Sequence, residues 1–359
     1  MRGLLKLLLV LVIAAVAYLA FWPVPLQPQA WTPPVAPATD AGPYAVNTRL
    51  HDAAKLAAGF GRGPEGLALD AQGNVYAGFD DGRVVRFDAN GANPQLLLDT
   101  KGRPLGLCAQ GGGLWIADAK KGLLHLDAQN QVDVTVTGAS GVPFAFTDDV
   151  DVAPDGQVYF SDASSRFGID NTMADVLEHG ASGRLLRYDP VTKQTSVVKD
   201  GFYFANGVAV GPNGDYVLVN ETTAYRVSRV WLKGEKAGQS EVFIDNLPGF
   251  PDNLSFNGKD RFWVALYAPR TKDLDSMLPH PALRKLAYRL PAFLQPKPAR
   301  HGFVVGLDLD GHVVTTLQDP APDSYSPITS AEQFGDWLYL GSLSYPAIGR
   351  VSLGKVLAQ

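Results

Sequence analysis

The sequence predicts an all-β fold, a six-bladed β-propeller, behind an N-terminal segment long and apolar enough to cross a membrane. One unit of short alternating strands recurs six times after about residue 59, and the 37 Gly and 26 Pro residues are spread out as turns between short strands require. We therefore expect a membrane anchor at 1–22, a linker and approach to the propeller at 23–58, and the propeller at 59–359, with a helical insertion at about 270–300.

The N-terminal segment is an uncharged run, Leu7 to Trp22, preceded by the basic residues Arg2 and Lys6. Residues 3–22 form a stretch of about twenty residues, which as a helix covers roughly the 30 Å hydrocarbon core of a bilayer. The basic residues before the span predict a cytoplasmic N-terminus and a propeller on the periplasmic or other extracytoplasmic side. A cleaved signal peptide is the alternative, because Ala15-Val16-Ala17 resembles a cleavage site.

The composition is globular and argues against a nucleic-acid surface. Hydrophobic residues make up 46% and charged residues 19%, and the net charge of −5 comes without basic runs. Binding to nucleic acid needs clustered Lys and Arg, so we expect no nucleic-acid partner. The single cysteine, Cys108, lies in an apolar run and is expected to be a buried, inert thiol. No cluster of Cys and His with metal-ligand spacing is present in the sequence.

The repeated unit consists of an alternating apolar strand, a turn with Asp or Gly, and an aromatic-rich strand. Most copies start about forty to sixty residues apart, which is the spacing of propeller blades. The alternative, a β-sandwich, does not repeat one unit six times. The predicted blade starts are Glu65, Leu105, Asp148 with Asp149, Asn206, Asp252 with Asn253, and Thr329.

Two segments depart from the repeat. Residues Pro23 to Pro43 are rich in Pro and Ala and are expected to form an extended linker that holds the propeller off the membrane. Between Pro269 and His301, the stretch from Ser276 to Leu290 predicts an amphipathic helix over one mouth of the propeller. Its expected apolar face is Leu283, Leu286, Ala287 and Leu290, with Arg284, Lys285 and Arg289 opposite. Either this helix simply caps the mouth, or it also lies on the lipid surface beside the anchor.

The blade starts predict a metal site. The innermost strands of a propeller begin at the same end of its channel, so equivalent positions in the repeats form a ring. Carboxylates buried this close together repel one another unless a cation neutralises them. Hard oxygen ligands without thiolate or imidazole suit Ca²⁺. We expect one Ca²⁺ held by Glu65, Asn206, Asp252 and Asn253, with Asp148 near it or bound to it. For each residue taken singly, a turn or strand-cap role is the alternative.

Other polar residues suggest structural roles. Asp118, Asp162 and Glu221 recur at the end of the second strand of their blades, where we expect them to accept hydrogen bonds in turns. Ser161 and Ser164 offer hydroxyls, but no Gly-x-Ser-x-Gly elbow surrounds them.

Several ordered strings resemble motifs of the strictosidine synthase-like family, in the superfamily of the SMP-30/gluconolactonase and paraoxonase propellers. They include Ile116-Ala-Asp-Ala-Lys-Lys-Gly122, Tyr159-Phe-Ser-Asp-Ala-Ser-Ser165, Gly183-Arg-Leu-Leu-Arg-Tyr-Asp189 and Leu247-Pro-Gly-Phe-Pro-Asp-Asn253. The resemblance covers nearly the whole chain, including the N-terminal span and the helical insertion. It implies a calcium-dependent propeller with arylesterase-like or lactone-hydrolase activity, in which the metal ligands of the relatives fall on Glu65, Asn206 and Asp252.

Two departures from the relatives bear on the mechanism. Paraoxonase-like enzymes have a histidine where this chain has Leu105, so the general base would be a carboxylate, Asp148 or Glu65, acting through a water. The plant alkaloid synthases use a glutamate of the last blade, near which this chain has Thr329 and Ser330. A strictosidine-type condensation of an amine with an aldehyde is therefore not expected.

The resulting hypothesis is a membrane-anchored, calcium-dependent hydrolase of small-molecule esters or lactones. Residues 3–22 are its contact with the membrane, and Glu65, Asp148 and Asp252 are its expected catalytic residues. The alternative is a non-catalytic binding propeller in which Ca²⁺ only stabilises the channel.

Overall fold

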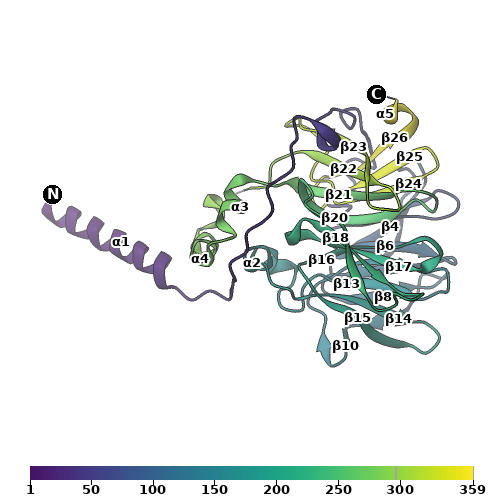
Figure 1. Ribbon diagram of the computed structural model, residues 1–359, viewed down its shortest axis with the longest axis horizontal. Helices are drawn as coiled ribbons and strands as arrows, with labels where there is room; N and C mark the ends of the chain where they lie inside the picture. Colours follow the sequence, from purple (N-terminus) through teal and green to yellow (C-terminus); the bar gives the residue numbers. More distant parts are fainter. Residues whose placement is uncertain (296, 359) are drawn as a thin grey trace.

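The computed structural model describes residues 1–295 and 297–358 and has six four-stranded antiparallel sheets, which confirms the six-bladed propeller (Figure 1). Blade 1 contains β2 (Leu67–Leu69), β3 (Val75–Gly78), β4 (Arg83–Phe87) and β5 (Gln95–Asp99). Blade 2 contains β6 (Pro104–Gln110), β7 (Gly113–Asp118), β8 (Gly122–Leu126) and β9 (Val132–Val136). Blade 3 contains β12 (Thr147–Val152), β13 (Val158–Asp162), β14 (Gly183–Asp189) and β15 (Gln194–Phe202). Blade 4 contains β16 (Ala205–Val210), β17 (Tyr216–Glu221), β18 (Arg226–Trp231) and β19 (Ser240–Ile244). Blade 5 contains β20 (Gly249–Phe256), β21 (Phe262–Pro269), β22 (Gly302–Leu307) and β23 (Val313–Asp319).

The last blade is closed by the N-terminal part of the chain. It contains β24 (Ser330–Phe334), β25 (Trp337–Gly341) and β26 (Ile348–Ser352), and its fourth strand is β1 (Ala54–Leu56), which pairs antiparallel with β26. The predicted boundary at residue 59 is therefore wrong, because the propeller already begins at Ala54. Pairing the two ends of the chain removes an exposed sheet edge, which explains why the closing strand comes from so far away in the sequence.

The hydrophobic core is a ring of interfaces between blades. One cluster of buried apolar residues lies between each pair of neighbouring blades. Leu218 of blade 4 packs with Phe262 of blade 5, for example, and Phe87 of blade 1 with Ile348 of blade 6. All six residues of β17 are buried, because its two faces contact different neighbours.

The innermost strands approach one another closely around the channel. They contact in the order β2, β6, β12, β16, β20, β24 and back to β2. A Cβ on Gly66 would lie 1.7 Å from the Leu105 carbonyl oxygen, and one on Gly207 would lie 2.5 Å from the Leu254 nitrogen. These glycines follow blade starts, so the residues before them are held close to the axis of the channel.

The carboxylates at the ends of the second strands have the structural roles expected of them. Asp118 accepts hydrogen bonds from the backbone N–H groups of Arg103, Lys120 and Lys121. Glu221 likewise accepts from the Tyr203 N–H and from the side chain of Arg226.

Helices gather on one side of the propeller, at the left in Figure 1. They are α1 (Arg2–Phe21), α2 (Thr172–Glu178) in the loop after β13, and α3 (Lys272–Met277) and α4 (Pro281–Arg289) in the loop after β21. The remaining elements are α5 (Leu353–Leu357), the hairpin of β10 (Gly138–Ala139) and β11 (Val142–Pro143), and the 3₁₀ turns η1 (Gly42–Tyr44), η2 (Ile169–Asn171), η3 (Pro212–Gly214), η4 (Thr222–Ala224) and η5 (Ala292–Leu294). By length and composition, α1 can cross a membrane, and none of its residues is buried.

The insertion differs from the prediction in two respects. It contains two helices in place of one, because Pro279 and Pro281 interrupt the helical run and Pro281 begins α4. Arg284, expected on the outer polar face, is fully buried and donates hydrogen bonds to the carbonyl oxygens of Leu177 and Glu178, each at 3.2 Å. The predicted orientation of this helix was therefore wrong, whereas its position over one mouth is confirmed.

The segment after α1 is not a free spacer. Leu26 is 2% exposed and packs with α2 and α4, and the Trp31 N–H donates to the Leu278 carbonyl oxygen at 3.2 Å. Arg284 also donates to the Gln29 carbonyl oxygen. The segment expected to be a linker therefore binds along the helices at the mouth of the propeller.

We expect Asp162→Ala to lower the free energy of unfolding by about 3–5 kcal/mol, because it leaves Arg184 buried without its partner. Asp162 accepts from Arg184 Nε at 3.1 Å, and the two side chains are 0% and 7% exposed. Urea denaturation of the full chain in detergent measures the loss.

The matched control for this prediction is Asp81→Ala. The Asp81–Arg83 pair has side chains that are 48% and 29% exposed, and exposed pairs contribute less than about 1 kcal/mol. Equal losses in the two variants would contradict the assignment of Asp162 as a structural partner.

Candidate functional site

Four of the predicted site residues lie at the floor of one cavity of about 440 Å³ on the helical side of the propeller. They are Glu65, Asp148, Asn206 and Asp252, from blades 1, 3, 4 and 5. The fifth, Asn253, donates from Nδ2 to Glu65 Oε1 at 2.9 Å. The structure therefore brings together residues separated by up to 188 positions in the sequence.

Two oxygens at this floor have no hydrogen-bond partner. Glu65 Oε2 and Asn206 Oδ1 are buried and accept no hydrogen bond from any residue that the structure describes. Asn253 Oδ1 is also unpaired, but Asn253 lines the smaller cavity at the opposite end of the channel. Buried polar atoms are nearly always paired, since an unpaired one costs about 1–3 kcal/mol. Two unpaired acceptors that line one cavity with the carboxylates of Asp148 and Asp252 indicate a site for a cation.

The pKa shifts of the carboxyl groups at the cavity floor also indicate a site for a cation. Burial raises the pKa of Glu65 to about 7, although the charge of Arg103 opposes the shift. Burial also raises the pKa of Asp148 and of Asp252 well above the ordinary range, and the negative charges of the neighbouring carboxylates add to both shifts. Each raised pKa means that the site disfavours the ionised carboxylate, and a divalent cation bound by the ionised carboxylates would remove the repulsion.

The walls and roof of the cavity are mainly apolar. The walls come from Phe146 and Phe204, just before β12 and β16, and from Phe250 in β20 and Tyr267 in β21. The roof comes from α2, α3 and α4, through Met173, Leu177, Leu274, Met277 and Ala287. A carbon-rich cavity with a few convergent oxygens at its floor is the usual form of a small-molecule site.

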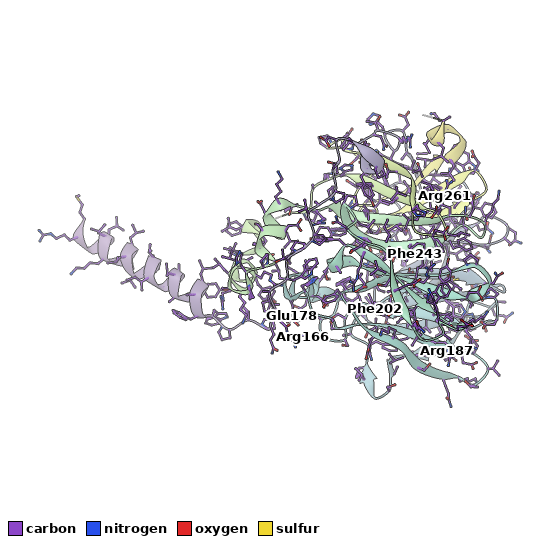
Figure 2. The ribbon with its side chains drawn as sticks, viewed as in Figure 1. Arg166, Glu178, Arg187, Phe202, Phe243 and Arg261 are labelled. Carbon is purple, nitrogen blue, oxygen red and sulfur yellow. The ribbon has the colours of Figure 1, made fainter. Side chains whose placement is uncertain are left out.

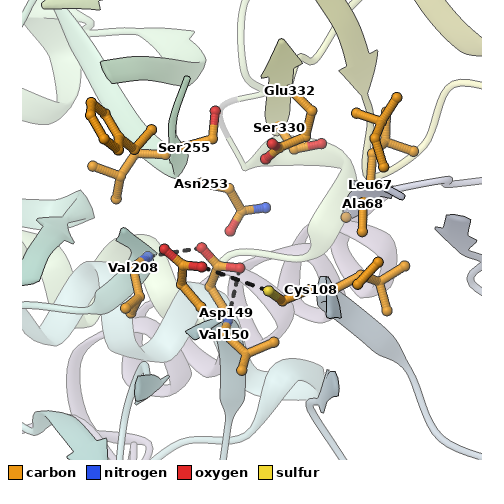
Figure 3. Close-up of a pocket in the computed structure, with 17 residues that line it drawn as sticks. Leu67, Ala68, Cys108, Asp149, Val150, Val208, Asn253, Ser255, Ser330 and Glu332 are labelled. Atoms are coloured by element: carbon orange, nitrogen blue, oxygen red, sulfur yellow. Dashed lines mark hydrogen bonds between the residues drawn. The ribbon is translucent and has the colours of Figure 1, made fainter. Parts of the chain in front are cut away.

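A smaller cavity of about 130 Å³ occupies the opposite end of the channel, and Figure 3 shows its lining. Asp149 and Asp151 lie here, and each accepts a backbone N–H from blade 4, from Val208 at 2.8 Å and from Val210 at 2.7 Å. These two carboxylates therefore brace neighbouring blades. Burial raises the pKa of Asp151 to about 6 and also raises the pKa of Glu332, which faces the same cavity.

Cys108 is half-buried, not buried as expected, but its surroundings agree with the predicted inertness of the thiol. Its thiol lies 3.6 Å from Asp151 Oδ1, and burial raises the pKa of the thiol well above its usual range. A thiol that stays protonated is a poor nucleophile.

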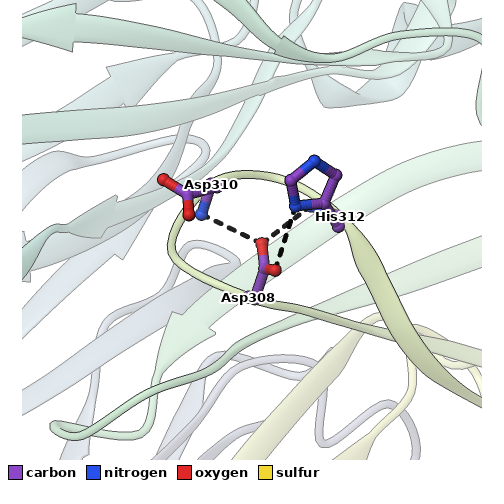
Figure 4. Close-up of side chains that lie close together, drawn as sticks. All are labelled: Asp308, Asp310 and His312. Carbon is purple, nitrogen blue, oxygen red and sulfur yellow. Dashed lines mark hydrogen bonds and ion pairs between the residues drawn. The ribbon is translucent and has the colours of Figure 1, made fainter.

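A second group of potential metal ligands, Asp308, Asp310 and His312, lies in the turn between β22 and β23 (Figure 4). One ligand atom from each lies within 4.8 Å of the others. The Asp308 carboxylate already accepts the backbone N–H groups of Asp310 and His312, at 2.9 and 2.8 Å, and the His312 side chain is 77% exposed. This is the geometry of a hydrogen-bonded turn, and the cluster lies away from both cavities.

Some residues of the floor and roof were missed by the sequence analysis. Arg103 is 6% exposed, donates to the Gly63 carbonyl oxygen at 3.0 Å and places a positive charge beside Glu65. Its position immediately before the start of blade 2 is a signal that could have suggested this role. The apolar roof residues Met173, Leu274 and Met277 come from inserted loops. These loops lie outside the repeat, so the repeat could not predict where their side chains lie.

This architecture defines the class of the protein: a six-bladed propeller with an oxygen-lined floor at one end of the channel and an apolar cavity above it. Solved structures with the same fold include a gluconolactonase from Xanthomonas campestris, 18% identical over 92% of this chain and 98% of that one with a TM-score of 0.59. Another is regucalcin, a calcium-binding protein from Agrobacterium tumefaciens, 16% identical over 81% of this chain and 92% of that one with a TM-score of 0.56.

Comparison of the sequence identifies the family within that class. The strictosidine synthase model matches residues 148–235, and the strictosidine synthase-like N-terminal model matches residues 42–87. The strictosidine synthase-like 4 protein of Arabidopsis thaliana is 34% identical over 88% of this chain and 86% of its own length. The adipocyte plasma membrane-associated protein of Danio rerio is 34% identical over 92% of this chain and 85% of its own length. The chain belongs to the strictosidine synthase-like family, which confirms the resemblance seen in its motifs.

We expect a divalent cation to raise the melting temperature more at pH 8 than at pH 5. A carboxyl group with a raised pKa, such as Glu65 at about 7, stabilises the fold at low pH while it is protonated and loses this contribution as the pH rises through its pKa. A cation must displace the proton at low pH but binds the ionised group freely at high pH. At roughly a hundredfold excess of free cation over its dissociation constant, the gain is about 2.7 kcal/mol.

Calorimetry of the full chain in detergent, with and without Ca²⁺ or Mg²⁺ at each pH, measures this shift. Asp252→Asn is expected to abolish it, whereas Asp308→Asn, which changes the exposed turn, is expected to leave it intact. A shift lost only in Asp308→Asn would place the cation in the turn instead.

Proposed function

We propose that the protein is a membrane-anchored, calcium-dependent hydrolase of esters or lactones. The observation that carries the proposal is the set of unpaired buried oxygens and carboxylates at the floor of an apolar cavity. Propellers of the same fold named as a gluconolactonase and as the calcium-binding protein regucalcin support it.

The donor set at the floor favours Ca²⁺. Glu65, Asn206 and Asp252 would hold the ion, with Asn253 and Asp148 beside it, so that every ligand is a carboxylate or amide oxygen. No cysteine or histidine is among the residues that line this cavity. When bound, the ion would polarise the carbonyl of an ester or lactone and stabilise negative charge on its oxygen.

Asp148 is the residue best placed to accept a proton from the attacking water. Glu65 has one oxygen engaged by Asn253, and its other, unpaired oxygen is needed as a ligand. Within the described chain, no hydrogen-bond donor contacts the Asp148 carboxylate, which faces the cavity. Its burial raises its pKa and so makes it a stronger base once it is ionised. The aromatic walls would hold the acyl or aryl part of the substrate and exclude bulk water.

Other candidate bases and reactions fit the geometry less well. His179 is stacked between Trp31 and Tyr203, with ring centroids 4.0 and 4.6 Å away, and its burial lowers its pKa to about 3. Leu105 lines the cavity where paraoxonase-like relatives have a histidine. Glu332 of the last blade faces the opposite cavity, so a glutamate-assisted condensation is not proposed.

For the membrane topology, we favour an uncleaved α1 with the N-terminus in the cytoplasm. Arg2 and Lys6 precede the apolar stretch, and positive charge is retained on the cytoplasmic side. The propeller would then face outside the cytoplasm. The relatives named as plasma membrane-associated proteins are consistent with an anchored chain.

A second candidate function is a non-catalytic binding propeller. The observation that favours it is the way Glu65 joins three blades: Asn253 of blade 5 binds its side chain, and Ser330 of blade 6 donates to its carbonyl oxygen at 2.7 Å. A cation at Glu65 would strengthen this junction without any reaction.

We expect the full chain to hydrolyse aryl acetates or lactones and to lose this activity when Ca²⁺ is chelated. Asp148→Asn should lower kcat by roughly 100-fold or more while Ca²⁺ still raises the melting temperature, since general base catalysis contributes about that much. Asp252→Asn should lose both activity and the calcium response. Assays of initial rate with paired calorimetry measure these effects.

Asp308→Asn is the control, because it makes the same replacement of a carboxylate by an amide at an exposed turn. Its activity should match that of the wild type. A thermal response to Ca²⁺ with no turnover of any ester or lactone would contradict the hydrolase and support the binding propeller.

A further inference from the structure

The roof of the cavity carries apolar side chains on its outer surface. In α4, Arg284 is fully buried, whereas Leu283 and Leu286 are 44% and 36% exposed. In the turn that follows, Phe293 and Leu294 are 78% and 57% exposed. We call these four exposed residues the outer roof surface. An amphipathic helix facing water normally buries its apolar side chains and exposes its charged ones, so the reversed arrangement indicates a surface that meets an apolar phase.

The same helix is bound to the end of α1. Arg289, the last residue of α4, donates from Nη1 to the Leu19 carbonyl oxygen at 2.9 Å and from Nε to the Trp22 carbonyl oxygen at 2.7 Å. The last carbonyls of a helix lack partners within the helix and favour a cation. Because α1 ends in aromatic residues typical of the membrane interface, these contacts would hold α4 at the depth of the lipid headgroups if α1 crosses a bilayer.

The segment between α1 and the propeller fixes this orientation. The Gln27 N–H donates to Glu178 Oε2 at 2.7 Å, and the Trp31 ring stacks on His179 at 4.0 Å between centroids. Leu26 is buried against α2 and α4. Figures 1 and 2 show α1 on the side of the propeller that carries α2 and α4, so a bilayer crossed by α1 would lie on this helical side.

We infer that the outer roof surface lies on the bilayer that α1 crosses, and that the cavity beneath it takes lipophilic esters or lactones from that bilayer. Lys285 and Arg289 lie beside the apolar residues of α4, which suits contact with anionic headgroups. The inner faces of α2, α3 and α4 line the cavity through Leu177, Leu274 and Ala287. The cavity is thus separated from the outer roof surface by about one helix diameter, 10–12 Å. Contact with the bilayer stands on the geometry alone, whereas the substrate class rests on the proposed function.

The first test measures the contact with lipid, independently of catalysis. The full chain is reconstituted into vesicles of phosphatidylcholine and phosphatidylglycerol, with an environment-sensitive fluorophore on Leu286→Cys. Lipids that carry a quencher on the acyl chain should quench this label roughly tenfold more strongly than a label on Val314→Cys. Val314 is 49% exposed on the outer strand of blade 5 and serves as the matched position. Labelling of the wild type gives the background from the half-buried Cys108.

Equal quenching at the two positions would overturn the contact with the bilayer. Energy transfer between Leu286→Cys labels on different molecules, without quenching by lipid, would also overturn it, because a second copy of the chain would then cover the surface.

The second test measures access of the substrate. Wild type and the double variant Leu283→Glu/Leu286→Glu are assayed in the same vesicles with p-nitrophenyl acetate, which stays in water, and p-nitrophenyl dodecanoate, which partitions into the bilayer. The variant should lose roughly tenfold in turnover of the dodecanoate ester and keep acetate turnover within about twofold, because neither leucine lines the cavity.

Equal effects on the two esters would overturn access from the bilayer. Hydrolysis of neither ester by the wild type would overturn the proposed function and the substrate class with it, and the quenching measurement would still decide the contact with the bilayer.

Discussion

Closure of the ring between the first and last blades is the interaction on which the rest of the structure depends. The strand β1 completes blade 6, and Ser330 of that blade holds the carbonyl oxygen of Glu65 at the start of blade 1. Without this junction, the six innermost strands would have no common axis, and the oxygens that converge at the floor of the cavity would have no fixed positions. The closure is therefore as much a part of the site as the side chains that face it.

The buried carboxylates of this protein separate into two groups according to their partners. Asp118, Asp162 and Glu221 each accept several hydrogen bonds from neighbouring loops, although Asp118 Oδ2 has no partner among the described residues. Backbone N–H groups donate to all three, and arginine side chains also donate to Asp162 and Glu221, so these carboxylates fix loops against blades. Glu65 and Asp252 lie among unpaired oxygens and have pKa values raised by burial. Burial alone does not distinguish the two groups. The number of donors around each carboxylate does, and this is the physical basis for assigning a cation to one group only.

The repeat in the sequence was sufficient to predict the fold and to place Glu65, Asp148, Asn206 and Asp252 on one ring, because the geometry of a propeller converts equivalent positions into neighbours. Features that depend on contacts between distant segments were not predictable in this way. The three residues of β1 carry too little pattern to be recognised as a strand.

The orientation of α4 also depends on contacts between distant segments, and one residue sets it. The spacing of Leu283 and Leu286 predicts an inward apolar face. The actual orientation is set by Arg284, whose partners are carbonyl oxygens of α2 and of the segment after α1. A helix that exposes leucines to bury one arginine is explained only when both of those segments, and the end of α1, are in place.

Arg289 and Arg284 connect α1 and the segment after it directly to α4 in the cavity roof. Arg289 holds the end of α1, and Arg284, one turn earlier in α4, holds the segment that follows it. In a membrane crossed by α1, a change in the tilt of α1 imposed by bilayer thickness or curvature would therefore act directly on α4 and on the cavity beneath it. If α1 anchors the chain, it also couples the cavity mechanically to the membrane, and the shape of the cavity would depend on that membrane.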